Sequence, residues 1–83
     1  MSEYTDTLKQ SIQNYTLPIL EEIMTGGYEP EIIPSVIKAR LSAAYSNDQR
    51  ISEIINIEIT EDDESYSVSS EIRAVNSNEI IEV

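Results

Sequence analysis

The chain contains no histidine, cysteine, tryptophan or phenylalanine, and it has only two glycines and three prolines in 83 residues. The lack of histidine removes the commonest general base, the usual catalytic triads and most zinc sites. The lack of cysteine removes disulfides and thiolate chemistry. The two glycines, Gly26 and Gly27, are adjacent and follow a helix-like segment, so they do not form a phosphate-binding loop. We therefore expect neither enzymatic activity nor a cofactor.

Long apolar runs are also missing. No stretch approaches the roughly 20 apolar residues of a membrane-spanning helix. Residues 1–6 are acidic and polar, unlike the basic and apolar regions of a secretory signal. We expect an intracellular, soluble protein that forms one domain over residues 1–83. A chain of this size buries about 60–65% of its unfolded surface, so its core is thin, and a partner surface would help to complete it.

The net charge of −11 is unevenly distributed along the chain. Residues 1–50 hold seven acidic and four basic residues, which is −3, whereas residues 51–83 hold nine acidic residues and Arg73 alone, which is −8. The acidic half would repel nucleic acid and anionic membranes and would attract a basic protein. The alternative is that the charge serves solubility only.

The first half of the chain has helical periodicity. One apolar stripe predicts a helix over residues 3–14. We expect Pro18 to interrupt it, because proline lacks an amide donor, and Thr16 to cap a second short helix over residues 17–24. A third helix is expected from Ile33 to the stop signal at residues 46–48. The first stripe consists of Tyr4, Leu8, Ile12 and Tyr15; Leu20, Ile23 and Met24 would face inward from the second helix; the third helix has Ile33, Val36, Ile37, Leu41 and Ala44.

From Ile54 onward the period changes to two, which is typical of strands. Turn residues at 61–64 and 76–78 divide this region into three strands, the last of which is Glu79–Val83. We expect an α+β fold with two or three N-terminal helices (residues 1–47) packed on a three-stranded antiparallel β-meander (residues 51–83). The inward-facing sets would be Ile55, Ile57 and Ile59 on the first strand, and Tyr66, Val68, Ser70, Ile72 and Ala74 on the second.

The acidic turn over residues 61–64 does not predict a chemical site. It lacks the residue spacing of a calcium-binding loop. A glycosidase needs two carboxylates across a cleft, one with a raised pKa, and a solvated hairpin tip does not raise a pKa. We interpret these residues as a solvated loop.

Two features are candidates for partner binding. Arg50 lies between a helix end and the sheet; it either pairs with a carboxylate of a neighbouring subunit or caps the last carbonyls of the third helix. The terminal strand either accepts a strand from another protein at its edge or is protected from such pairing by its two glutamates. Its candidate residues are Glu79, Ile80, Ile81, Glu82 and Val83.

The order of helix, basic corner and alternating strands resembles a known family. The segment Ile33–Tyr45, the corner Asp48-Gln49-Arg50-Ile51 and the strand Ile55–Ile59 are similar to the C-terminal part of phage baseplate wedge proteins, the sheath initiators of contractile tails, sometimes labelled lysozyme-like. Members typically have a Glu-Pro-Arg corner; the arginine matches here and the proline does not. The resemblance spans about residues 29–83.

The resemblance implies a structural, non-catalytic role in the virion or the host cytoplasm. Arg50 would face other wedge components, and the edge Glu79–Val83 would pair with an extended arm of the tail sheath. The main alternative is a small acidic inhibitor that mimics nucleic acid, such as an anti-restriction, anti-CRISPR or repair-enzyme inhibitor. It is suggested by the −8 charge of residues 51–83, with Glu58, Glu71 and Glu82 on one face.

Overall fold

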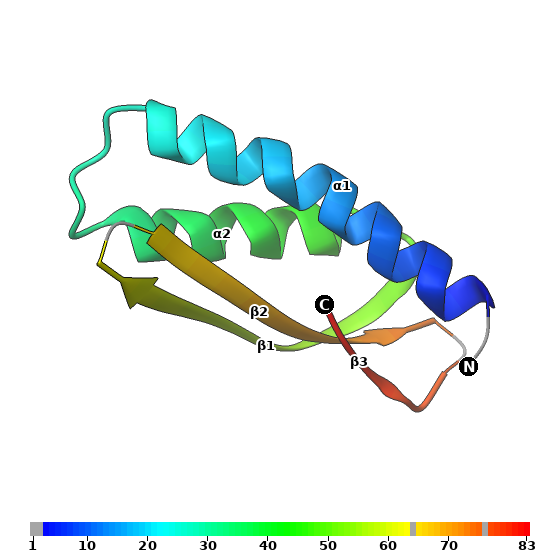
Figure 1. Ribbon diagram of the computed structural model, residues 1–83. Helices are drawn as coiled ribbons and strands as arrows, with labels where there is room; N and C mark the ends of the chain where they lie inside the picture. Colours follow the sequence, from blue (N-terminus) through cyan, green and yellow to red (C-terminus); the bar gives the residue numbers. More distant parts are fainter. Residues whose placement is uncertain (1–2, 64, 76) are drawn as a thin grey trace.

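Two helices are followed by a three-stranded antiparallel sheet, which confirms the predicted α+β class (Figure 1). The computed structural model describes residues 3–63, 65–75 and 77–83. Its elements are α1 (Glu3–Thr25), α2 (Ile33–Ser46), β1 (Ile51–Asp62), β2 (Ser65–Ala74) and β3 (Ile80–Glu82). The strand order is β1-β2-β3, and both helices lie on the same face of the sheet (Figure 1).

The helix α1 runs without a break through Pro18, so the predicted interruption is wrong. Pro18 lies on the exposed face of α1, and Asn14, whose carbonyl would have received the missing hydrogen bond, is exposed too. Water can therefore hydrate that carbonyl, while packing of the opposite face keeps the helix continuous. Thr16 accordingly lies inside the helix and does not cap one. The packed stripe continues past the proline as Leu8, Ile12, Tyr15, Ile19, Leu20 and Ile23.

The end of α1 and the whole of α2 largely follow the sequence pattern. Gly27 has a φ of 78°, the left-handed conformation expected after a helix. Met24, however, is 47% exposed and does not face inward as predicted. The helix α2 begins at Ile33 as expected, and one addition to its stripe is Tyr45, which is buried one turn beyond Leu41. The side chain of Tyr4, predicted for the first stripe, lies outside the described residues.

In the sheet, β2 places its inward residues as predicted and β1 does so only in part. Register shifts in β1 occur between Ile51 and Glu53 and between Ile54 and Asn56. The second shift turns Ile54 toward the core and leaves Ile55 38% exposed, so the prediction for Ile55 is wrong. A bulge inserts an extra residue and reverses the alternation, which a strict period of two does not anticipate.

The core lies between the helices and the inward face of the sheet. Ser70 is the only buried polar residue recorded for the described part of the chain. Neither described helix combines the length and the apolar character that crossing a membrane requires. The buried apolar residues are Leu8, Ile12, Ile23, Ile33, Ile37, Leu41, Tyr45, Ile57, Ile72, Ala74 and Ile81.

The first predicted turn is shorter than expected, whereas β3 begins at Ile80, one residue later than predicted. Glu61 and Asp62 belong to β1, where they pair with Tyr66 and Ser65 of β2. Glu64 and Asn76, which were predicted for the two turns, lie outside the described residues.

Candidate partner-binding site

The last strand is much shorter than its neighbour, and this leaves half of β2 without a partner on one side. Three residues of β3 pair with β2, from Arg73↔Ile80 to Glu71↔Glu82. Val83 extends this ladder by exchanging two backbone hydrogen bonds with Ser70, at 3.2 and 2.8 Å. Among the described residues, no strand continues the ladder along Ser65–Ser69. The sheet therefore has an open edge where β3 ends (Figure 1).

Backbone groups of Tyr66 and Val68 face this open edge. Because Ser70 exchanges both hydrogen bonds with Val83, its N–H and C=O point toward β3. Alternate residues of a strand direct their backbone groups to the same side, so those of Val68 and Tyr66 also point that way. The described residues provide no backbone partner for them at this edge. Unpaired donors and acceptors of this kind are a template for another strand.

A cavity of about 280 Å³ lies between α1 and this part of β2. Leu17 and Leu20 of α1 contribute apolar side chains from one side, and Val68 does so from the sheet. Leu17 is 61% exposed. We call the open edge together with this cavity the strand groove; the cavity is lined by Gln13, Thr16, Leu17, Leu20, Tyr45, Val68, Ser70 and Val83.

The strand groove also contains polar atoms. The hydroxyl groups of Tyr45 and Ser70 form a buried hydrogen bond of 2.8 Å. The Oγ1 atom of Thr16 is buried and has no hydrogen-bond partner in the described structure. A buried polar atom without a partner is costly, so Thr16 leaves hydrogen-bonding capacity open on the helix side of the groove.

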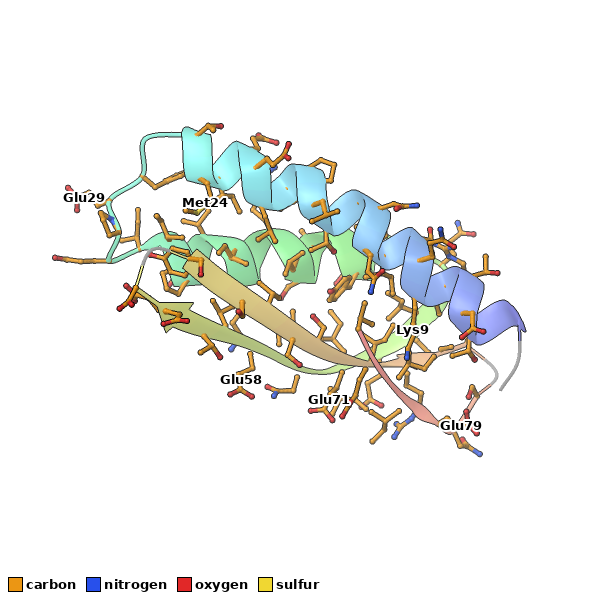
Figure 2. The ribbon with its side chains drawn as sticks, in the orientation of Figure 1. Lys9, Met24, Glu29, Glu58, Glu71 and Glu79 are labelled. Atoms are coloured by element: carbon orange, nitrogen blue, oxygen red, sulfur yellow. The ribbon has the colours of Figure 1, made fainter. Side chains whose placement is uncertain are left out.

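The opposite face of the sheet is acidic beside the groove. Glu71 and Glu82 are directly opposite each other in the β2–β3 register, and Glu58 is opposite Ser69 in the β1–β2 register. Figure 2 shows Glu58 and Glu71 on the side of the sheet away from the helices. Arg73, the base nearest in sequence, forms an ion pair with Glu53. Because like charges directly opposite each other on a sheet repel, the pairing of Glu71 with Glu82 destabilises the free protein; among the described residues, Lys9 of α1 lines a pocket with both carboxylates and forms no ion pair with either.

The predicted site residues at the C-terminus divide into core and surface. Ile81 is buried and belongs to the core, so its side chain is not free for a partner. Ile80 is 50% exposed and pairs with Arg73, while Glu79 and Glu82 are exposed. Val83 is half-buried and lines the strand groove.

Arg50 does not line the strand groove; it organises the corner between α2 and β1. Its guanidinium donates to Asp48 Oδ1 at 2.9 Å and Oδ2 at 2.8 Å, and to the Ser11 hydroxyl at 2.9 Å. The bond to Ser11 connects the corner to α1, a role for Arg50 that the sequence does not predict. A contact between Arg50 and a neighbouring subunit stays a prediction.

The same corner shifts two pKa values. Hydrogen bonding to the Arg50 side chain holds the pKa of Asp48 below its usual value. Burial, followed by the negative charge of Asp48, raises the pKa of Tyr15, whose hydroxyl donates to Asp48 at 3.3 Å. Both shifts favour a charged Asp48 and a neutral Tyr15 at neutral pH. These charge states keep the hydrogen bonds from Arg50 and Tyr15 to Asp48 formed.

The sequence pattern indicates the terminal strand but not the groove next to it. The sequence pattern predicts Thr16 as the cap of a second short helix containing Leu17 and Leu20, and it places Tyr66 and Val68 on the inward face of the second strand. No signal in the sequence places Leu17 and Leu20 beside Val68, because these residues lie about fifty positions apart in the chain.

Comparison with known proteins gives no relative from which a function can be transferred. Neither family models, curated proteins nor solved structures match this chain.

Proposed function

We propose that this protein is a non-enzymatic assembly protein of a phage or phage-like contractile tail baseplate, which docks a sheath or wedge protein by strand addition. The observation that carries the proposal is the open edge of β2 at Tyr66 and Val68. An added strand would complete the ladder that β3 leaves unfinished and would cover Leu17. The tail assignment itself rests on the resemblance of residues 29–83 to sheath initiators.

The other edge of the sheet, on β1, is a weaker candidate. It carries two register shifts, and exposed acidic residues flank it at Glu58, Glu61 and Asp62. Bulges and charged residues are the usual means by which a sheet edge avoids pairing with another chain. The edge of β2 at the strand groove has a cavity in place of such protection.

A pair of proline substitutions tests the edge directly. Val68 and Ile59 are opposite each other in the register and are both half-buried on the inward face. Their amides point to opposite edges: Val68 to the groove, Ile59 away from β2. Proline removes an amide donor and is tolerated where that donor faces an edge. We expect Val68→Pro to abolish binding to purified sheath or wedge protein, and Ile59→Pro to leave it intact.

Hydrogen exchange provides a second measurement that does not depend on how well the variants fold. In the unmodified protein, binding of the tail protein should protect the amides of Tyr66 and Val68. Deleting Glu79–Val83 is a less specific test, because it also removes Ile81 from the core. Binding without protection of Tyr66 and Val68, or binding lost only in Ile59→Pro, contradicts docking at this edge. No binding to any sheath or wedge protein contradicts the tail assignment.

A second candidate function is mimicry of nucleic acid, favoured by the acidic face. Glu71 opposite Glu82, with Glu58 on the next strand, forms a row of carboxylates across the sheet. Exposed Ser67 and Ser69 dilute this row, and Arg73 interrupts it. Competition with DNA for nucleases and repair enzymes at low salt tests this alternative, and a failure to compete removes it.

A further inference from the structure

The strand groove has a different chemical character on its two sides, and this specifies the strand that fits it. A strand that continues the line of β3 beyond Val83 runs antiparallel to β2. Its positions opposite Val68 and Tyr66 face the helices, as those two residues do. Its positions opposite Ser69 and Ser67 face the acidic side of the sheet.

The inward position opposite Val68 enters the cavity. Apolar side chains of Leu17, Leu20 and Val68 dominate that space, and Leu17 is largely exposed without an occupant. An apolar side chain placed there removes its own surface and that of Leu17 from water. The inward position therefore favours a residue such as valine or leucine.

The outward position opposite Ser69 lies among carboxylates. If the added strand continues the direction of β3, this position comes two residues after Glu82. On the other side of Ser69, Glu58 of β1 is the register partner of Ser69. Glu71 is the next outward residue of β2. None of these three carboxylates forms an ion pair within the described part of the chain. The small side chain of Ser69 leaves room for a long cationic side chain to reach them.

We infer that the strand groove accepts a basic extended segment of a different protein, with an apolar residue opposite Val68 and lysine or arginine at the flanking outward positions. The inference rests on the proposed strand addition and specifies the chemistry of the partner. A second copy of this chain is disfavoured as the occupant, because two molecules of charge −11 repel each other. A basic strand also relieves the opposition of Glu71 and Glu82.

Synthetic peptides test the inference. The probe is a short end-capped peptide of alternating valine and lysine, compared with one of alternating valine and glutamate. A third peptide has the composition of the first with its valines and lysines in separate blocks. Binding is measured by fluorescence anisotropy at low and high salt, and the site by hydrogen exchange. We expect the alternating lysine peptide to bind most tightly, to protect the amides of Tyr66 and Val68, and to weaken with salt.

Matched variants separate the two sides of the groove. Glu82→Gln and Glu71→Gln should each weaken the lysine peptide by about twofold to fivefold. Glu29→Gln, at an exposed glutamate that does not line the cavity, should not (Figure 2). Leu17→Gln should weaken all alternating peptides, whereas Ile32→Gln, at a similarly exposed apolar residue outside the groove, should not.

Four outcomes would overturn the inference. Equal binding of the lysine and glutamate peptides contradicts the basic partner, and equal binding of the block peptide contradicts the strand. Unchanged affinity in Glu82→Gln and Glu71→Gln contradicts the role of the acidic face. A dimer that forms at rising concentration and protects Tyr66 and Val68 identifies a second copy as the occupant.

The result also distinguishes this inference from the proposed function. A tail protein that binds the groove regardless of the glutamine substitutions overturns only the basic chemistry. Peptide binding as expected, with no sheath or wedge protein bound, overturns only the tail assignment.

Discussion

The hydroxyl of Tyr45 on α2 and the hydroxyl of Ser70 on β2 are joined by a buried hydrogen bond of 2.8 Å. The bond connects a helix to the centre of the sheet at the inner wall of the strand groove. Tyr45 also packs edge-to-face against Tyr15 of α1, with ring centroids 6.2 Å apart. One side chain thus links both helices and the sheet. The shape of the groove consequently depends on this contact.

Removing either hydroxyl should destabilise the protein by leaving the other buried without a partner. We expect Tyr45→Phe or Ser70→Ala to lower the free energy of unfolding by about 1–3 kcal/mol. The double variant should cost less than the sum, because it removes both polar groups. Urea denaturation measures all three, with Tyr28→Phe at an exposed tyrosine as the control. Strict additivity of the two single changes would contradict a coupled pair.

The Asp48–Arg50 ion pair should make the free energy of unfolding depend on pH in the acidic range. The pKa of Asp48 is lowered in the folded state, so its stabilisation is present above the unfolded value of about 3.9 and is lost as the pH falls through the folded value. Asp48→Asn should therefore lose about 1–3 kcal/mol at pH 7, and the gap to the unmodified protein should narrow below about pH 4. Thermal unfolding of both proteins between pH 7 and pH 2 measures this difference in stability. Asp62→Asn, at an exposed aspartate, is the control; a gap that stays constant down to pH 2 would contradict the role of Asp48.

Replacing Pro18 should stabilise α1. Alanine restores an amide that can donate to the carbonyl of Asn14, at an exposed position where no packing is lost. We expect Pro18→Ala to raise the free energy of unfolding by about 1–3 kcal/mol. Circular dichroism should show unchanged helix content, since the helix is already continuous. A loss of stability would mean that the proline has a packing role that its exposure does not suggest.

Thr16→Val should also stabilise the free protein. The change keeps the shape of the side chain and removes a buried hydroxyl that has no partner. We expect a gain of about 1 kcal/mol in denaturant titrations, and no gain from Thr7→Val on the exposed face of the same helix. An unchanged or lower stability would indicate that a water molecule satisfies the hydroxyl in solution.

Glu82→Gln should weaken binding of the basic strand and stabilise the free protein. Because Glu71 and Glu82 are directly opposite each other, neutralising one should raise the free energy of unfolding by about 0.2–1 kcal/mol at low salt. Added salt should reduce this gain through screening. The melting temperature at two salt concentrations measures the effect, with Glu29→Gln as the control for net charge. A gain of equal size in the control would attribute the effect to net charge alone.

Much of the fold was predictable because its patterns are local. The stripe of α2 from Ile33 to Leu41 and the alternation of β2 from Tyr66 to Ala74 both matched the structure. The predictions were wrong where tertiary packing or an irregular register overrode a local sequence pattern. Pro18 was expected to break a helix that packing keeps continuous, and the bulge near Ile54 reversed the alternation of β1.

The candidate site was less predictable, because it consists of groups that lie far apart in the sequence. Thr16, Leu17 and Leu20 line one cavity with Val68 and Val83, about fifty to sixty-five residues later. The sequence marks Arg50 as distinctive, but its partner Ser11 lies on α1, 39 residues earlier in the chain. The separation of two residues along the chain does not predict whether they lie close together in the folded protein.

The sequence by itself determined the helix and strand types, the acidic character of the sheet and the absence of histidine and cysteine chemistry, because these follow from residue identity and period. Only the tertiary structure decided that β3 pairs with β2 at Glu71–Arg73 and not along Ser65–Ser69, and that Leu17 and Leu20 of α1 line a cavity with Val68. The physical reason is that a sheet edge and a cavity are defined by which neighbour is missing, and neighbours are chosen by packing between distant segments.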